Sequence, residues 1–254
     1  MKCKVMNAKK EELMSVCEAL GMRGKMELGP IIDTVSGILS DIRTRKDEAV
    51  FEYTKRFDKA DINAQNVRVT EKEIADAMAS IDPKLISIIQ EAKNNIMAFH
   101  EKQREDGFVM QVGKGSEIGM RVRPISVAGV YVPGGTAPLP STVLMNVIPA
   151  KAAGVPRVVL CTPPRADGTI APVILAAASI AGADEIYKVG GAQAIVAMAC
   201  GTPSIPRVDK ICGPGNIYVN TAKRLVYGMV DIDMFAGPSE ILIIADESAN
   251  AEFV

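Results

Sequence analysis

Ile125-Ser126-Val127-Ala128-Gly129-Val130 leads directly into Tyr131-Val132-Pro133-Gly134-Gly135, an apolar run followed by a turn rich in proline and glycine. The pattern recurs in the second half of the chain, where similar turns follow short apolar runs at Gly190-Gly191-Ala192-Gln193, Gly213-Pro214-Gly215-Asn216 and Ala236-Gly237-Pro238-Ser239. In parallel α/β sheets such turns lie at the carboxyl ends of the strands, where ligands bind. The spacing therefore predicts one small-molecule site formed by several distant turns.

Composition excludes several classes of protein. The 254 residues are 48% hydrophobic with a net charge of −1, which is enough for a substantial core and gives no sign of a nucleic-acid-binding surface. No apolar stretch reaches the roughly 18 residues of a membrane span, so we predict no membrane partner. The N-terminus lacks a signal-peptide core, and the five cysteines are scattered. These features predict reduced thiols and a cytoplasmic location.

The second half alternates β-rich and alanine-rich segments. Helices are predicted near 141–153, 171–181, 192–200 and 215–227, with Ser141 capping the first, Pro149 kinking or ending it, and Pro172 near the start of the second. Strands are predicted near 125–131, 156–161, 185–189, 208–212, 230–233 and 240–245. The alternation predicts an α/β fold with a doubly wound, mostly parallel sheet, an incomplete Rossmann-like fold preceded by a helix-rich N-terminal region.

The first half has helical periodicity, with apolar residues between Val35 and Val50 recurring at helix spacing. Thr70-Glu71-Lys72-Glu73 has the pattern of a capping box, and Asp82-Pro83 begins a helix that runs to about Lys102. The stretch Glu105–Gly119 is interpreted as a hairpin or a loop.

We expect four parts: an N-terminal helical arm (1–24), a helix-rich portion of a first domain (25–124), a Rossmann-like domain (125–238), and a truncated strand returning to the first domain (239–254). Because a strong strand pattern is followed only by the entry to a helix, the chain is expected to be the N-terminal portion of a longer one.

The turns carry side chains suited to a nucleotide-sized ligand, each with a simpler alternative. Tyr131 could stack on a ring or simply pack, Gln193 could bind a ligand or be solvated, and Asn216 could bind a ligand or cap a helix. Backbone N–H groups near Ser141–Val143 could hold a pyrophosphate. The usual dinucleotide fingerprint is absent, however, and the second strand ends in Cys161-Thr162-Pro163-Pro164 without the acidic residue that grips a ribose.

Five segments resemble the histidinol dehydrogenase family in order and spacing. They are Gly129–Leu139, Ser141–Asn146, Val189–Ala194, Lys210–Asn216 and Ile232–Glu240. A weaker match in the first half includes Arg56-Phe57-Asp58 and Ile96–Gln103.

The resemblance implies an enzyme that oxidises L-histidinol to L-histidine through a bound aldehyde, using two NAD molecules in succession and one zinc ion. It implies that Tyr131, Gln193 and Asn216 contact NAD and that Ser239 contacts L-histidinol. It also implies a homodimer whose zinc site takes a ligand from across the dimer.

The chain departs from this family in several places. The family's zinc ligands and its catalytic Glu-His pair are expected after Val254, and the single histidine, His100, matches neither. We therefore predict no catalytic and no metal-binding residues within 1–254, and an inactive fragment. Lys46 stands where the family commonly has glycine, a change interpreted as helix-surface, and Phe235 stands where proline is usual. The alternatives are a nucleotide-binding or assembly module without chemistry, and an unrelated doubly wound enzyme.

Overall fold

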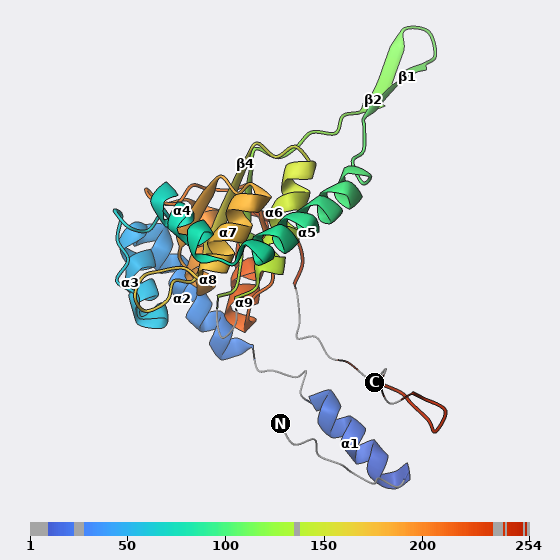
Figure 1. Ribbon diagram of the computed structural model, residues 1–254. Coiled ribbons are helices and arrows are strands. Elements are labelled where there is room, and N and C mark those ends of the chain that lie inside the picture. The colour runs from blue at the N-terminus through green and yellow to red at the C-terminus, as the bar shows by residue number, and fades with distance from the viewer. Residues whose placement is uncertain are drawn as a thin grey trace.

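The computed structural model describes residues 10–22, 28–134, 138–235, 241, 243–250 and 252. Figure 1 shows the arrangement of the helices and strands. The helices are α1 (Lys10–Met22), α2 (Gly29–Arg45), α3 (Asp47–Asp58), α4 (Glu71–Ser80), α5 (Pro83–Glu101), α6 (Pro140–Ala152), α7 (Pro172–Ala181), α8 (Gly191–Cys200) and α9 (Ile217–Val226). The strands are β1 (Phe108–Val112), β2 (Ser116–Met120), β3 (Val127–Tyr131), β4 (Arg157–Thr162), β5 (Glu185–Lys188), β6 (Lys210–Cys212) and β7 (Asp231–Ile232).

Among the described residues, five strands form a parallel sheet in the order β5-β4-β3-β6-β7. The chain begins this sheet at β3, adds β4 and β5 on one side, and then crosses back to add β6 and β7 on the other. Ala128 of β3 is consequently paired with Val158 of β4 on one side and with Lys210 of β6 on the other. The doubly wound α/β fold predicted from the sequence is confirmed, with its switch of direction between β3 and β6.

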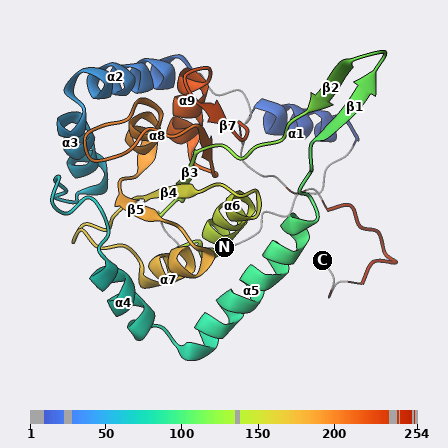
Figure 2. The same ribbon diagram turned by 90° about the horizontal axis from the view of Figure 1, so that it is seen from above.

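The core has two layers, one on each face of this sheet, because successive strand residues point to opposite faces. Tyr131, Val159 and Tyr187 pack with buried residues of α2, α3, α8 and α9. Val130, Leu160 and Ile186 pack on the other face with residues of α4, α5, α6 and α7. Figure 2 shows the sheet between these two groups of helices. Burial on both faces explains why the interior positions of the strands are apolar, with the charged residues at the strand ends.

The predicted starts of two N-terminal helices are confirmed. Thr70 and Glu73 form the reciprocal capping box of α4, and Asp82 caps α5 with Pro83 at its first position. The helix-rich region does not stand apart, since α2 packs on α8 and α4 packs on α7. The division into parts at residues 24, 124 and 238 stays a prediction.

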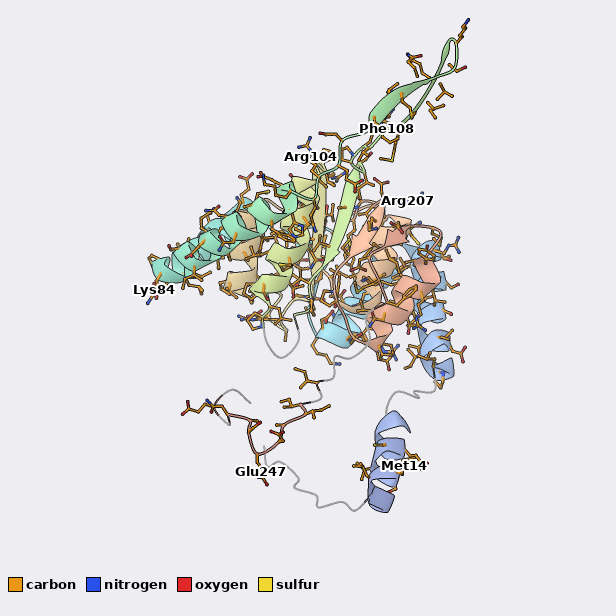
Figure 3. The ribbon with its side chains drawn as sticks, turned by 90° about the vertical axis from the view of Figure 1, so that its right-hand side faces the viewer. Met14, Lys84, Arg104, Phe108, Arg207 and Glu247 are labelled. Carbon is orange, nitrogen blue, oxygen red and sulfur yellow. The ribbon has the colours of Figure 1, made fainter. Side chains whose placement is uncertain are left out.

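Strands β1 and β2 form an antiparallel hairpin, which decides between the hairpin and the loop expected for this stretch. All ten of its strand residues are exposed, including Phe108, Val109 and Ile118. The hairpin extends away from the body of the molecule (Figures 1 and 3), and Phe108 is labelled on it in Figure 3. It therefore presents apolar side chains to solvent.

The expected N-cap of α6 was wrong. Its N-cap is Leu139 and Pro140 takes the first helical position, so Ser141 lies inside the first turn and does not cap it. The fixed φ of proline suits that first position, which moves the helix start ahead of the serine. The helix does not end at Pro149 but continues to Ala152, with Val147 and Ile148 beside the proline fully buried. A kink at Pro149 stays a prediction.

The strand expected over 240–245 is not found in the described residues of that range. Ile241 and Ile244 are each 89% exposed and no strand is assigned there. An apolar pattern forms a strand only where a neighbouring strand offers hydrogen bonds, and in the described part of the chain the sheet ends at β7, which is two residues long.

No described helix is long and apolar enough to cross a membrane.

The interpretation of Lys46 as a helix-surface change was also wrong. Lys46 joins α2 to α3 with φ 54° and ψ −126°. Residues other than glycine rarely adopt this backbone conformation, because the Cβ atom clashes with the backbone. The α2–α3 corner requires this conformation because Lys46 N still donates to Ile42 O at the end of one helix while Lys46 O accepts from Val50 N at the start of the next. A glycine would adopt it without strain.

Candidate functional site

A cavity of about 980 Å³ lies at the carboxyl ends of the strands, next to the switch between β3 and β6. The turns after β3, β4, β5 and β6 all contribute to its wall, and so do α2 and α3. Among the lining residues are Tyr131, Gly134, Pro163, Arg165, Gln193 and Asn216 from the sheet side, and Ile38, Tyr53, Arg56 and Asp58 from the helices. The structure therefore brings together Tyr131, Gln193 and Asn216, three of the four residues predicted to form the site.

Tyr131, at the end of β3, is only 4% exposed. Its hydroxyl oxygen accepts a hydrogen bond from Gly191 N at 3.1 Å, which ties the turn after β5 to the central strand. Burial raises the pKa of Tyr131 to about 12, so the phenol stays neutral at physiological pH. Tyr131 thus both packs and lines the cavity, and its contact with NAD stays a prediction.

Gln193 lies in the first turn of α8 and is 1% exposed, so the solvated alternative was wrong. Its Nε2 donates to Asp58 Oδ2 over a long 3.3 Å, and its Oε1 is buried without a hydrogen-bond partner. Gly191 has φ 61°, and a Cβ there would lie 2.6 Å from Gln193 Oε1. Glycine at 191 therefore makes room for a buried amide that has unused hydrogen-bonding capacity.

Asn216 is the N-cap of α9, where its Oδ1 accepts from Val219 N at 3.0 Å. The capping role is therefore confirmed. The side chain is also exposed at the cavity wall, so capping and ligand contact are compatible. Ser239, predicted to contact L-histidinol, lies outside the described residues.

A buried ion pair that the sequence analysis missed holds the turn between β6 and α9. Lys223 is fully buried, and its Nζ donates to Gly213 O at 2.6 Å and to Asp233 Oδ1 at 2.5 Å. Asp233 Oδ2 accepts from Gly213 N at 2.7 Å, which satisfies both backbone groups of this glycine. The available signal was the position of Lys223 on the same apolar face of α9 as Val219 and Val226.

Gly213 shows why that turn must be held closely. Its φ is 119°, and a Cβ there would lie 2.0 Å from Tyr131 O. The turns after β3 and β6 therefore touch backbone to backbone at the switch point, a separation that only glycine allows.

The α3 side of the cavity carries charges that the sequence analysis did not assign to the site. Asp58 is half-buried at the end of α3, and desolvation raises its pKa to about 6. Arg56 and Arg165 are exposed at the cavity wall, one from α3 and one from the loop after β4. Arg56 and Asp58 lie in the weaker first-half match to the family, which was the signal that could have placed them here.

These residues fit a dinucleotide. Two guanidinium groups suit a pyrophosphate, and the incompletely bonded amide of Gln193 suits a polar ligand group. They do not fit zinc, because the described residues contain no group of three or more His, Cys, Asp or Glu side chains able to hold a metal ion. His100 does not belong to such a group. It lies near the end of α5, where its Nδ1 is 2.6 Å from Gln103 Oε1 at the surface.

The fold and cavity together define a doubly wound α/β protein with a cavity at the switch point. The family model for histidinol dehydrogenase matches residues 22–254, and the chain belongs to this family.

Several relatives share this family name. The chain is 55% identical to histidinol dehydrogenase of Bacillus thuringiensis subsp. konkukian (strain 97-27) over 87% of this chain and 51% of the relative. It is 54% identical to that of Heliobacterium mobile, again over 87% of this chain and 51% of the relative. The crystal structure of histidinol dehydrogenase from Elizabethkingia anophelis superposes with a TM-score of 0.81 at 47% identity, covering 90% of this chain and 52% of that one. The chain thus spans about half the length of the curated relatives it matches.

Proposed function

We propose that this chain forms the NAD-binding part of a histidinol dehydrogenase, which oxidises L-histidinol to L-histidine through histidinal. The observation that supports this most is the convergence of Tyr131, Gln193 and Asn216 on one cavity at the switch point. Two NAD molecules bound in succession would supply the hydride acceptors, one for the oxidation of the alcohol and one for that of the aldehyde. The chain's own residues would shape the crevice and orient the dinucleotide, with Arg56 and Arg165 attracting its pyrophosphate.

NAD binding can be measured by isothermal titration calorimetry on the purified protein. We expect NAD to bind and a Gln193→Leu variant, which keeps the side-chain volume and removes the amide, to bind it at least fivefold more weakly. Gln90→Leu is the matched control, because Gln90 lies exposed on α5, is not among the residues that line the cavity, and donates a hydrogen bond to Asn94. Failure of the unmodified protein to bind NAD would remove the proposed function.

We further propose that residues 1–254 do not by themselves oxidise L-histidinol. No zinc-binding group exists among the described residues, and the single histidine lies on α5. NADH formation in the presence of zinc and L-histidinol is the direct assay, with the histidinol dehydrogenase of Bacillus thuringiensis as positive control. Zinc-dependent turnover by 1–254 would contradict this proposal.

Ser239 is proposed to contact L-histidinol. The protein is also proposed to be cytoplasmic.

The apolar hairpin supports a third proposal, that the protein is a homodimer. Met110 and Ile118 are paired across β1 and β2, and both are about half exposed on a sheet with no covering layer in the described part of the chain. Sedimentation equilibrium should show a dimer that Met110→Lys with Ile118→Lys weakens. Ile88→Lys on α5 replaces an equally exposed apolar residue and should leave the dimer intact. A monodisperse monomer would contradict the proposal.

A further inference from the structure

We propose that Asp58 accepts hydrogen bonds from the hydroxyls of the adenosine ribose of NAD, and so selects NAD over NADP. This inference rests on the proposed NAD site and adds to it the residue that reads the ribose. In doubly wound dinucleotide-binding folds, an acidic residue at the end of the second strand performs this task. Here β4 is the second strand of the sheet, and it runs into Thr162-Pro163-Pro164 without any carboxylate.

The structure brings a carboxylate to the same half of the crevice from outside the sheet. Asp58 is the last residue of α3, which packs against α8 on the sheet face that carries Tyr131 and Tyr187. Its Oδ2 lies 3.3 Å from Gln193 Nε2, and Gln193 lies in the first turn of α8, the helix that follows β5. Asp58 therefore lies on the β4–β5 side of the switch point, the side where the first three strands of such a fold hold the adenosine.

The carboxylate of Asp58 is free to accept further hydrogen bonds. An ionised carboxylate offers about four acceptor positions, whereas this one has a single long bond from an amide. Within the described residues Asp58 forms no ion pair within 4.0 Å. Arg56, two residues earlier on the same helix, also lines the cavity but is not paired with Asp58. A half-buried carboxylate with so little compensation is costly unless a ligand uses it.

A ribose is the part of NAD that matches such an acceptor. Its two neighbouring hydroxyls are both donors and can reach the two oxygens of one carboxylate. A 2′-phosphate in the same place would bring negative charge against the carboxylate and lose a donor. The same contact that holds the NAD ribose would therefore exclude NADP.

The two remaining charged groups at the cavity wall do not replace this role. Arg56 and Arg165 are exposed and have no ion pair within the described part of the chain, so they remain available to the pyrophosphate. Phosphate binding by these arginines and ribose binding by Asp58 would together account for both polar parts of the adenosine diphosphate half of NAD.

The experiment measures affinities by calorimetry for NAD, NADP and an NAD analogue lacking the adenosine 2′-hydroxyl. The unmodified protein should prefer NAD to NADP and lose about tenfold in affinity for the deoxy analogue. Asp58→Asn should bind NAD and the deoxy analogue almost equally and should lose most of its preference for NAD over NADP. Asp61→Asn is the matched control, because Asp61 lies in the loop just after α3, is not among the residues that line the cavity, and pairs with Lys55 at the surface.

The outcomes separate this inference from the proposed function. If the unmodified protein binds NAD and the deoxy analogue equally well, the inference is wrong while the NAD site stands, and this holds even if Asp58→Asn fails to fold. An unchanged preference for NAD over NADP in a folded Asp58→Asn variant would also overturn it. If the unmodified protein binds no NAD, both the proposed function and the inference are wrong.

Discussion

Lys223 Nζ lies 2.5 Å from Asp233 Oδ1, and the two side chains together hold both backbone groups of Gly213. The pair joins α9 to the segment just after β7, and both side chains bond Gly213, the first residue of the turn that connects β6 to α9. These bonds hold the turn at the switch point in place. The position of Asn216 at the cavity therefore depends on the buried ammonium group of Lys223.

Replacing Lys223 with methionine should destabilise the protein by about 3 kcal/mol, because Asp233 and the Gly213 carbonyl oxygen would lose a buried cationic donor. Chemical denaturation gives the free energy of unfolding directly. Lys210→Met is the matched control, since it breaks the neighbouring but partly exposed pair with Asp231 and should change stability by less than about 1 kcal/mol. Equal losses in the two variants would show that burial of the Lys223 pair is unimportant.

Lys46→Gly should stabilise the protein by about 1 kcal/mol, because glycine adopts the φ of 54° at the α2–α3 corner without strain. Thermal unfolding should show a higher Tm for this variant. Lys55→Gly should have the opposite effect, since Lys55 lies within α3 and glycine there loses about 1 kcal/mol of helix stability. A lower Tm for Lys46→Gly would mean that the lysine side chain contributes more to the free energy of unfolding than its backbone strain costs.

The capping and ligand-binding roles of Asn216 can be separated by two substitutions. Asn216→Ser keeps a good N-cap but removes the amide, whereas Asn216→Ala removes both and should cost about 1 kcal/mol of stability. If Asn216 contacts NAD, both variants should bind NAD several-fold more weakly although only the alanine variant loses stability. Normal NAD affinity in Asn216→Ser would leave capping as its sole role.

Asp58 should make stability fall as pH rises through the range from about 4 to 6. Its pKa is raised by desolvation from 3.8 to about 6, so the folded protein binds more protons than the unfolded chain between these values. Asp58→Asn is neutral throughout, so its Tm relative to the unmodified protein should increase from pH 4 to pH 7. Arg56 and Arg165 also line this cavity. Tyr131 lines it too, and it does not titrate in this range because burial raises its pKa to about 12. A constant difference in Tm across this range would contradict the raised pKa.

The sheet and the helices around it were predictable because their signals are local. Thr70 and Glu73 lie three residues apart, so the capping box they form at the start of α4 needs no distant part of the chain. The glycine turns after β3, β5 and β6 mark strand ends, and parallel strands necessarily bring those ends to one edge. This is why Tyr131, Gln193 and Asn216 could be grouped without any knowledge of contacts.

The parts that were missed depend on tertiary packing. Asp58 reaches the cavity only because α3 packs over α8, and its partner Gln193 lies 135 residues later in the chain. The conformation of Lys46 follows from the angle between two packed helices, which no residue pattern in that segment specifies. The expected strand over 240–245 depended on a pairing edge, and an apolar run by itself supplies no such edge.

The central claim is that the turns after the parallel strands form one NAD site, and a crystal structure of the protein grown with NAD tests it most directly. The account predicts the dinucleotide in the cavity between Tyr131, Gln193 and Asn216, with its adenosine ribose hydroxyls within 3.2 Å of Asp58, a normal hydrogen-bond distance. NAD bound elsewhere on the molecule, with this cavity left to solvent, would contradict it.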